Sequence, residues 1–121
     1  MTNKYNLRER ILQFVLDVIA LIRILPDNRV NQIFIAQIIR SVSSIGANYE
    51  EADGTPTKKD FAYKMSLVKK EAKETKYWLT LIKLTNSERF NKTIDELCIE
   101  NEELIKIVAS IIIKSSYIVG H

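Results

Sequence analysis

The chain has 121 residues, of which 46% are hydrophobic, and a formal net charge of +3, so it is long enough for one domain with a buried core and is only mildly basic. Its single cysteine, Cys98, excludes an internal disulfide and indicates a reducing compartment. Because the N-terminal residues have no secretion-signal pattern and no apolar run approaches the roughly 20 residues of a membrane span, we expect a single cytoplasmic domain over residues 1–121 with no membrane segment.

The first predicted element is an amphipathic helix over residues 7–25. Asn6, with Glu9 three residues later, has the pattern of a capping box. Apolar residues then recur at helical spacing and should form the buried face: Leu7, Ile11, Phe14, Val15, Val18, Ile22 and Leu25. Pro26 ends this helix, and the short turn after it predicts an antiparallel second helix.

The second predicted helix covers residues 29–52 and is capped by Asn28. Its expected core positions are Val30, Phe34, Gln37, Ile38, Ser41, Ile45 and Asn48. Because Gln37, Ser41 and Asn48 are polar, the apolar stripe is interrupted, and a buried amide without a partner costs about 1–3 kcal/mol. Either these residues form a hydrogen-bonded layer that fixes the register of the helices, or they line a ligand site.

The third predicted helix covers residues 58–84, after a capping box of Thr57 and Asp60. One face should be buried: Phe61, Met65, Val68, Ala72, Thr75, Leu79 and Ile82. A second face carries the candidate nucleic-acid-binding residues: Lys58, Lys59, Lys69, Lys70, Lys73, Lys76 and Lys83. Residues 58–85 have eight lysines against three carboxylates, and such a face either follows a phosphate backbone or is simply solvated. Tyr77 lies among these lysines, where it can stack on a base.

The fourth predicted helix covers residues 92–117. Its expected core face is Ile94, Leu97, Cys98, Leu104, Ile105, Val108, Ile111 and Ile112. All four helices carry a second apolar stripe, which indicates oligomerisation: Leu12, Leu16 and Ile19; Ile35, Ile39 and Val42; Leu67, Trp78 and Leu81; and Ile99, Ile107 and Ile113. We expect Leu67, Trp78 and Leu81 to contribute to the contact between copies.

The sequence contains no recognisable catalytic or metal-binding constellation. The only histidine is His121, so the Glu-x-x-His pattern of di-iron bundles is missing. Glu71 and Glu74 are interpreted as a salt-bridge or interface pair, with metal ligands as the alternative, and Cys98 as a small core residue. We therefore predict no enzymatic activity, no metal and no cofactor.

Three motifs connect the chain to a known family: SVSSIGANYEEA over residues 41–52, the KKDF that opens the third helix, and KEAKETKYWL over residues 70–79. Through them, the stretch from Ser41 to Ile82 resembles the four-helix-bundle proteins encoded in intervening sequences of bacterial 23S rRNA genes. Helix lengths and loop positions extend the resemblance more loosely over the whole chain. The fold is also similar to the accessory variability determinant of diversity-generating retroelements, a basic pentameric barrel that binds nucleic acid and a reverse transcriptase.

The resemblance implies an all-α, antiparallel up-down-up-down four-helix bundle that assembles into a ring-shaped homo-oligomer, with a pentamer as the expected number. It implies no enzymatic activity. Two functions follow as hypotheses. In the first, the lysine-rich face binds RNA or DNA as an accessory module, with a reverse transcriptase as a protein partner by analogy. In the second, the oligomer is a protein-interaction scaffold whose partner docks on apolar or acidic surface around the fourth helix.

Overall fold

The computed structural model describes residues 6–120, with side chains to residue 115, and consists of helices joined by short connections. The elements are α1 (Leu7–Ile24), α2 (Arg29–Asp53), α3 (Lys58–Thr85), the 3-10 turn η1 (Glu88–Phe90) and α4 (Asn91–Gly120). No strand occurs within residues 6–120. The prediction of an all-α chain with four helices is confirmed, and each predicted boundary lies within a few residues of the observed one.

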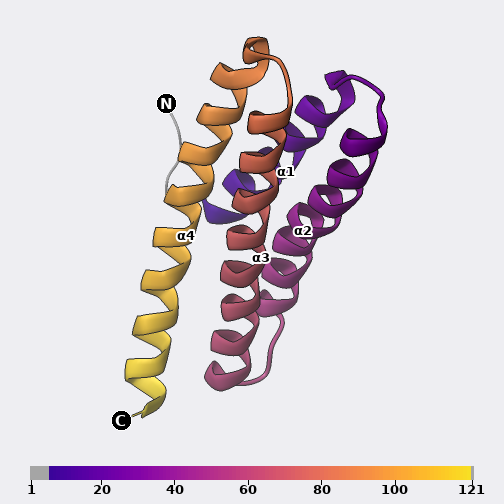
Figure 1. Cartoon of the computed structure of the whole chain (residues 1–121). Helices are drawn as coiled ribbons and strands as arrows, with labels where there is room; N and C mark the ends of the chain where they lie inside the picture. The colour runs from indigo at the N-terminus through magenta and orange to yellow at the C-terminus, as the bar shows by residue number, and fades with distance from the viewer. Residues whose placement is uncertain (1–5, 121) are drawn as a thin grey trace.

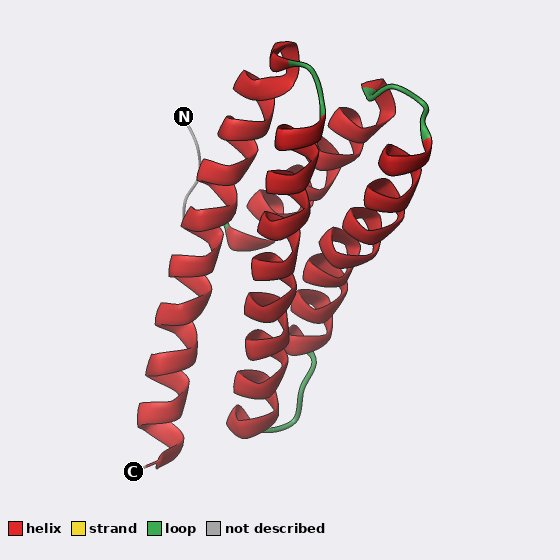
Figure 2. Ribbon diagram, in the orientation of Figure 1, coloured by secondary structure: helices red, strands yellow, loops and turns green. Residues whose placement is uncertain are grey.

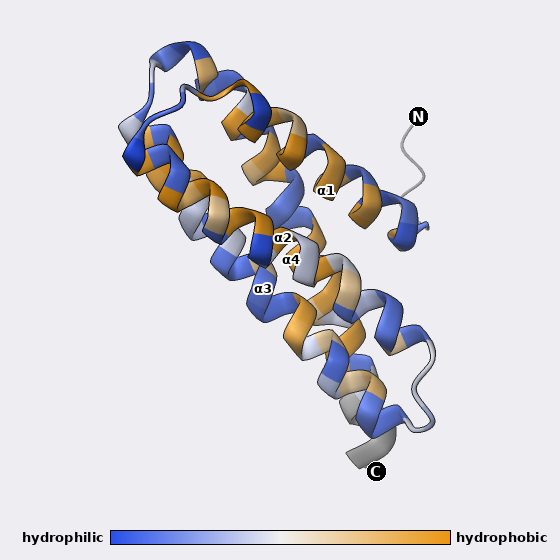
Figure 3. Ribbon diagram, turned by 90° about the vertical axis from the view of Figure 1, so that its right-hand side faces the viewer, coloured by the Kyte–Doolittle hydropathy of each residue, from blue (hydrophilic) through white to orange (hydrophobic). Residues whose placement is uncertain are grey.

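Each helix lies beside the helix that follows it in the chain (Figure 1). α2 packs against both α1 and α3, and α3 packs against both α2 and α4. The α1–α2 and α3–α4 connections lie at one end of the molecule, and the α2–α3 connection lies at the other (Figure 2). The contact between α1 and α4 is the least extensive of these four helix pairs. Hydrophobic residues recur along every helix, whereas the connections are mostly hydrophilic (Figure 3).

The helices differ in length, and this leaves part of α4 without α1 beside it. α1 has 18 residues and α4 has 30, which at 1.5 Å per residue correspond to about 27 Å and about 45 Å. An ion pair between Arg10, near the start of α1, and Glu100 marks where α1 begins along α4. The remaining turns of α4 extend past α1 along α3 (Figure 1).

Three helices begin with the side-chain caps that the sequence predicts. The Asn6 side chain accepts a hydrogen bond from the Glu9 backbone N–H at 3.1 Å, and Asn28 accepts one from the Asn31 N–H at 2.9 Å. The Thr57 hydroxyl accepts one from the Asp60 N–H at 3.0 Å. Each cap satisfies a backbone donor that the first turn of a helix leaves unpaired, and so fixes where the helix starts.

Most of the predicted core residues are buried, and the exceptions lie mainly on α2 and α4. Val30, expected in the core, is 47% exposed, because it lies in the first turn of α2 and the next residue, Asn31, takes the buried position. Val42, expected on an outer stripe, is 0% exposed, because α2 lies between α1 and α3 and buries a wider arc than one stripe. Leu21 of α1 is also buried and was not among the predicted core residues.

In the predicted polar layer, the Ser41 hydroxyl group has hydrogen-bond partners within the bundle. The hydroxyl groups of Ser41 and Thr75 lie 2.8 Å apart, both residues are fully buried, and Thr75 also donates to the Glu71 carbonyl. The Asn48 amide donates to the Ser44 carbonyl of its own helix. These hydrogen bonds favour the structural interpretation of the layer over a ligand site, since the buried hydroxyl groups already have partners.

A pair of amides that the sequence analysis missed, the buried Asn31 and the half-buried Asn86, joins α2 to the end of α3. The Asn31 and Asn86 side chains donate to each other's carbonyl oxygens at 2.9 Å, and Asn31 also donates to the Pro26 carbonyl at 2.8 Å. On α4, the fully buried Asn101 donates to the Ala72 carbonyl of α3 at 2.8 Å. Paired amides in an apolar core fix the register of the helices that carry them.

Within the described residues, no helix is both long and apolar enough to cross a bilayer.

The amide pair gives a first prediction. Asn86→Ala leaves the Asn31 carbonyl oxygen buried without a donor, so the free energy of unfolding should fall by about 1–3 kcal/mol in urea titrations at fixed protein concentration. The double variant Asn31→Leu/Asn86→Leu removes both amides. Its loss in the free energy of unfolding should be smaller than the sum of the losses in the two single leucine variants. Additive losses would show that the two amides do not act as a pair.

Candidate nucleic-acid interface

The seven lysines of the predicted basic face fall into three groups along α3. Lys58 and Lys59 are exposed in the first turn of the helix, beside the α2–α3 connection. Lys69, Lys70 and Lys73 lie near the middle, and Lys76 and Lys83 lie in the second half. The structure therefore does not present one uniform row of free charges.

Two of these lysines are neutralised within the chain by carboxylates of α4. Lys76 Nζ lies 2.7 Å from Glu102 Oε1, and Lys83 Nζ lies 2.7 Å from Asp95 Oδ1. The hydrogen bond from Lys76 to Glu102 raises the pKa of Lys76 above its ordinary value, so the lysine stays charged but faces a counter-ion. These pairs depend on how α3 and α4 align, which the lysine spacing does not reveal.

The middle group is the strongest candidate for binding an anion. Lys69, Lys70 and Lys73 line a shallow, open depression together with Ser66, and no described carboxylate forms an ion pair with any of the three. They fall within about one turn of the helix, so their charges reinforce one another. Lys106 of α4 is exposed and lies four residues after Glu102, on the same side of α4, and adds a further cation to this side.

Tyr77 lies next to this lysine face and is 56% exposed. Its ring meets the Trp78 ring edge to face at a centroid distance of 5.1 Å. The exposure is consistent with the predicted stacking role.

The residues expected at the contact between copies lie on the opposite side of α3, toward α2. Leu67, Trp78 and Leu81 are all half-buried. Trp78 already packs within the chain, since its ring lies 5.9 Å from the Phe34 ring of α2 and its indole N–H donates to Glu74 at 3.1 Å. Trp78 therefore has less free surface for a contact between copies, and the interface at Leu67, Trp78 and Leu81 stays a prediction.

The carboxylates beside Trp78 are part of an ion-pair network. Arg40 of α2 pairs with Glu71 at 3.3 Å and also with Glu74. This geometry agrees with the salt-bridge interpretation of Glu71 and Glu74 and does not resemble a metal site. Within residues 6–115, no group of three metal-ligating side chains converges, and His121 lies outside the described residues.

Several exposed apolar side chains of α1 and α2 belong to the predicted second stripes, whereas Ile24 and Ile33, at 60% and 53% exposed, lie outside them. Leu12 is 58% exposed, Leu16 is 49% exposed and Ile39 is 44% exposed. Ile99 and Ile113 of α4 are exposed as well, at 67% and 68%. The predicted stripes on α1, α2 and α4 are thus exposed in part, since Val42 is buried and Ile19, Ile35 and Ile107 are half-buried.

The sequence analysis expected acidic surface around the fourth helix but did not identify the acidic strip on the α1 side of α4. Glu96, Glu100 and Glu103 recur at helical spacing on that side, and Asp17 of α1 faces them across a groove. The repeat of Glu at i, i+4 and i+7 was the signal that would have revealed it.

The structure also gives a prediction for the single cysteine. Burial, with a smaller contribution from Asp95, raises the pKa of the half-buried Cys98 thiol, and the thiolate is the form that reacts. At about pH 8, iodoacetamide should therefore alkylate the native chain more slowly than the urea-unfolded chain, in which the ordinary pKa returns. Faster reaction of the native chain would instead indicate an activated thiol.

Comparison with known proteins agrees with this architecture. The family model described as 23S rRNA-intervening sequence protein matches residues 3–110. A crystal structure of a protein of unknown function from the S23 ribosomal protein family of Bacteroides thetaiotaomicron is similar, with a TM-score of 0.79 and 31% sequence identity, covering 88% of this chain and 97% of that one. No curated protein matches the chain. The chain therefore belongs to the 23S rRNA-intervening sequence protein family.

Proposed function

We propose that this chain is a non-enzymatic, oligomeric nucleic-acid-binding accessory module that uses the lysines of α3. The observation that carries the proposal is the group of Lys69, Lys70 and Lys73, which lines an exposed depression and forms no ion pair with any described carboxylate. In this proposal the single domain is an antiparallel up-down-up-down bundle, acts in the cytoplasm and needs no cofactor or metal.

The chemistry of these side chains defines the kind of binding. A lysine ammonium is a point charge that contacts phosphate and does not distinguish bases, so recognition is tolerant of sequence. One copy offers a weak site, whereas a ring of copies, with a pentamer as the expected number, gains affinity because several identical sites engage one strand. Lys58, Lys59 and Tyr77 extend the same face, while Lys76 and Lys83 contribute less because Glu102 and Asp95 already face them.

The family supports testing RNA before DNA. Its description refers to sequences within 23S rRNA, and the similar crystal structure is attributed to the S23 ribosomal protein family. The resemblance to the accessory variability determinant, which rests on the sequence alone, suggests a reverse transcriptase as a candidate protein partner.

A protein-interaction scaffold is the second candidate function, and two observations favour it. The exposed Leu12, Leu16 and Ile39 provide apolar surface for a protein contact. The pairing of Lys76 and Lys83 within the chain also reduces the charge available to phosphate. In this case Lys69, Lys70 and Lys73 serve as a solvated face.

A titration of labelled structured RNA and duplex DNA separates the two functions. Lys70→Gln/Lys73→Gln should weaken binding by about tenfold at about 50 mM salt and should reduce the slope of log K against log salt by about 2, since two phosphate contacts are lost. Arg23→Gln/Arg29→Gln is the matched control, because it removes the same charge from exposed positions at the α1–α2 connection.

The controls define what each result means. Equal weakening by the two pairs would show that net charge, and not the α3 surface, drives binding. If the wild-type chain binds neither nucleic acid at low salt, the scaffold function replaces the proposed one.

Assembly gives a separate prediction. Light scattering at micromolar concentration should give a mass that is a multiple of 14.0 kDa. Leu67→Glu/Leu81→Glu should reduce it to the monomer, because a charge in an apolar contact is costly to bury. Leu84→Glu, at a position that is 73% exposed near the end of α3, should leave the mass unchanged. A wild-type mass of 14.0 kDa would contradict the oligomer.

A further inference from the structure

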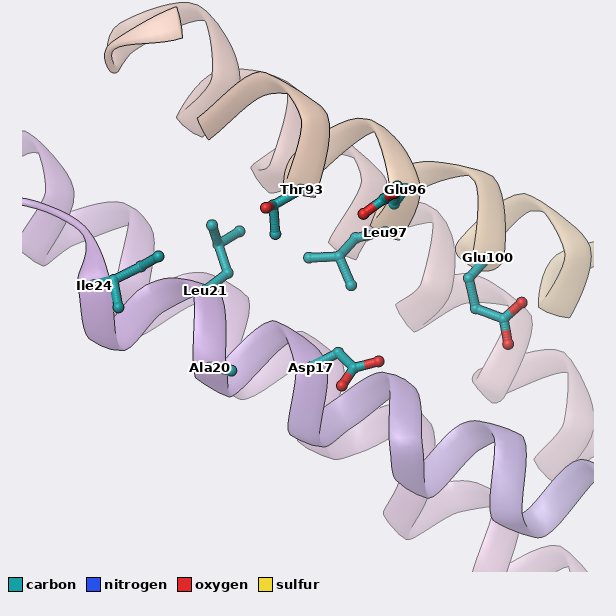
Figure 4. Close-up of a pocket in the computed structure, with 8 residues that line it drawn as sticks. All are labelled: Asp17, Ala20, Leu21, Ile24, Thr93, Glu96, Leu97 and Glu100. Carbon is teal, nitrogen blue, oxygen red and sulfur yellow. The ribbon is translucent and has the colours of Figure 1, made fainter. Parts of the chain in front are cut away.

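A groove with a volume of about 300 Å³ lies between α1 and α4, away from the lysines of α3 (Figure 4). Its floor is formed by Leu21 and Leu97, which are buried, and Ile24 forms one edge with 60% of its surface exposed. Asp17 lies on the α1 side, and Glu96 and Glu100 lie on the α4 side. The groove thus combines an apolar floor with carboxylates on both walls.

Short side chains explain why the two helices leave this space. Ala20 of α1 and Thr93 of α4 line the groove where larger residues would fill it. At the end of the groove nearer the start of α1, Arg10 forms two hydrogen bonds to Glu100, at 2.6 Å and 3.1 Å, and its side chain is only 10% exposed. This pair fixes the spacing between α1 and α4 while leaving the rest of the groove open.

The charge of the groove is not compensated within the described chain. Asp17 accepts a hydrogen bond from the Gln13 amide at 2.8 Å, which supplies no positive charge. No described lysine or arginine forms an ion pair with Asp17 or Glu96. Of the three carboxylates, only Glu100 has a cationic partner among the described residues, so within this part of the chain Asp17 and Glu96 stay uncompensated beside an apolar surface.

We propose that the α1–α4 groove is a docking site for a basic amphipathic helix of a partner protein. The groove extends over residues 17–24 of α1 and 93–100 of α4, which is about 10 Å, or two helical turns. An incoming helix fills this length with one aliphatic side chain over Leu21 and Leu97. Asp17 and Glu96 face each other from the two walls, so lysine or arginine residues three and four positions from it, toward the Glu100 end of the groove, reach one carboxylate each.

The proposal goes beyond nucleic-acid binding, because it uses a different surface and the opposite charge. A protein that works on the same nucleic acid is itself expected to be basic. An acidic groove on one side and a lysine face on another let one chain hold a cationic protein and an anionic strand at the same time.

The test uses a labelled, alanine-rich helical peptide of about 15 residues, with one leucine and two lysines that lie three and four residues from it on the same side in the sequence. We expect saturable binding to the full chain by fluorescence anisotropy at low salt. Asp17→Asn/Glu96→Gln should weaken it by about tenfold, because two exposed charge pairs are lost. Ala20→Tyr, which fills the groove without changing charge, should also weaken it.

Matched controls separate a specific site from general attraction. Glu9→Gln/Asp60→Asn removes the same charge from exposed positions outside the groove, where neither carboxylate forms an ion pair with a described lysine or arginine, and should leave binding unchanged. A peptide with glutamate in place of both lysines should not bind. Absence of saturable binding, or equal weakening by the two charge-neutralising pairs, would overturn the proposal.

Light scattering tests the competing occupant. Asp17 and Glu96 are exposed, so Asp17→Asn/Glu96→Gln should fold normally and keep the wild-type mass. A change of mass in this variant would show that a second copy of the chain occupies the groove, which would also overturn the proposal.

Discussion

The burial of one face of α3 between α2 and α4 decides where the charged side chains of that helix point. Met65, Val68, Ala72, Leu79 and Ile82 are almost completely buried, and the buried Ser41–Thr75 hydroxyl contact fixes α3 against α2. Once this face is fixed, the helical period places the Arg40 network on one side and the lysines on the other. Rotating α3 to move its charged side chains would therefore expose its core residues to solvent.

The acidic residues of α4 are divided between its two neighbours. Asp95 and Glu102 face α3 and pair with its lysines, whereas Glu96 and Glu100 face α1. The same helix thus lowers the positive charge of the α3 surface and supplies the negative charge of the groove. The modest net charge of the chain is the sum of two surfaces of opposite sign. A partner that binds one of these surfaces interacts with the local charge there and not with the net charge.

Much of the fold could be predicted from the sequence, because caps, apolar spacing and Pro26 are local signals. The contacts between helices could not, because they depend on alignment that no single helix encodes. The lysine spacing predicted a shared face of α3 but did not reveal that Glu102 and Asp95 face Lys76 and Lys83. Likewise, Val42 looked like an outer residue because its own helix gives no sign that α2 is covered on two sides.

The difference in length between α1 and α4 has a consequence for local stability. Leu104 and Val108 continue the buried face of α4 beyond the Arg10–Glu100 pair, where α1 no longer lies beside it. Opening this half of the helix breaks fewer interhelical contacts than opening the first half does. Amide hydrogen exchange should therefore be graded along α4, with slow exchange beside α1 and faster exchange, through local opening, toward the C-terminal turns.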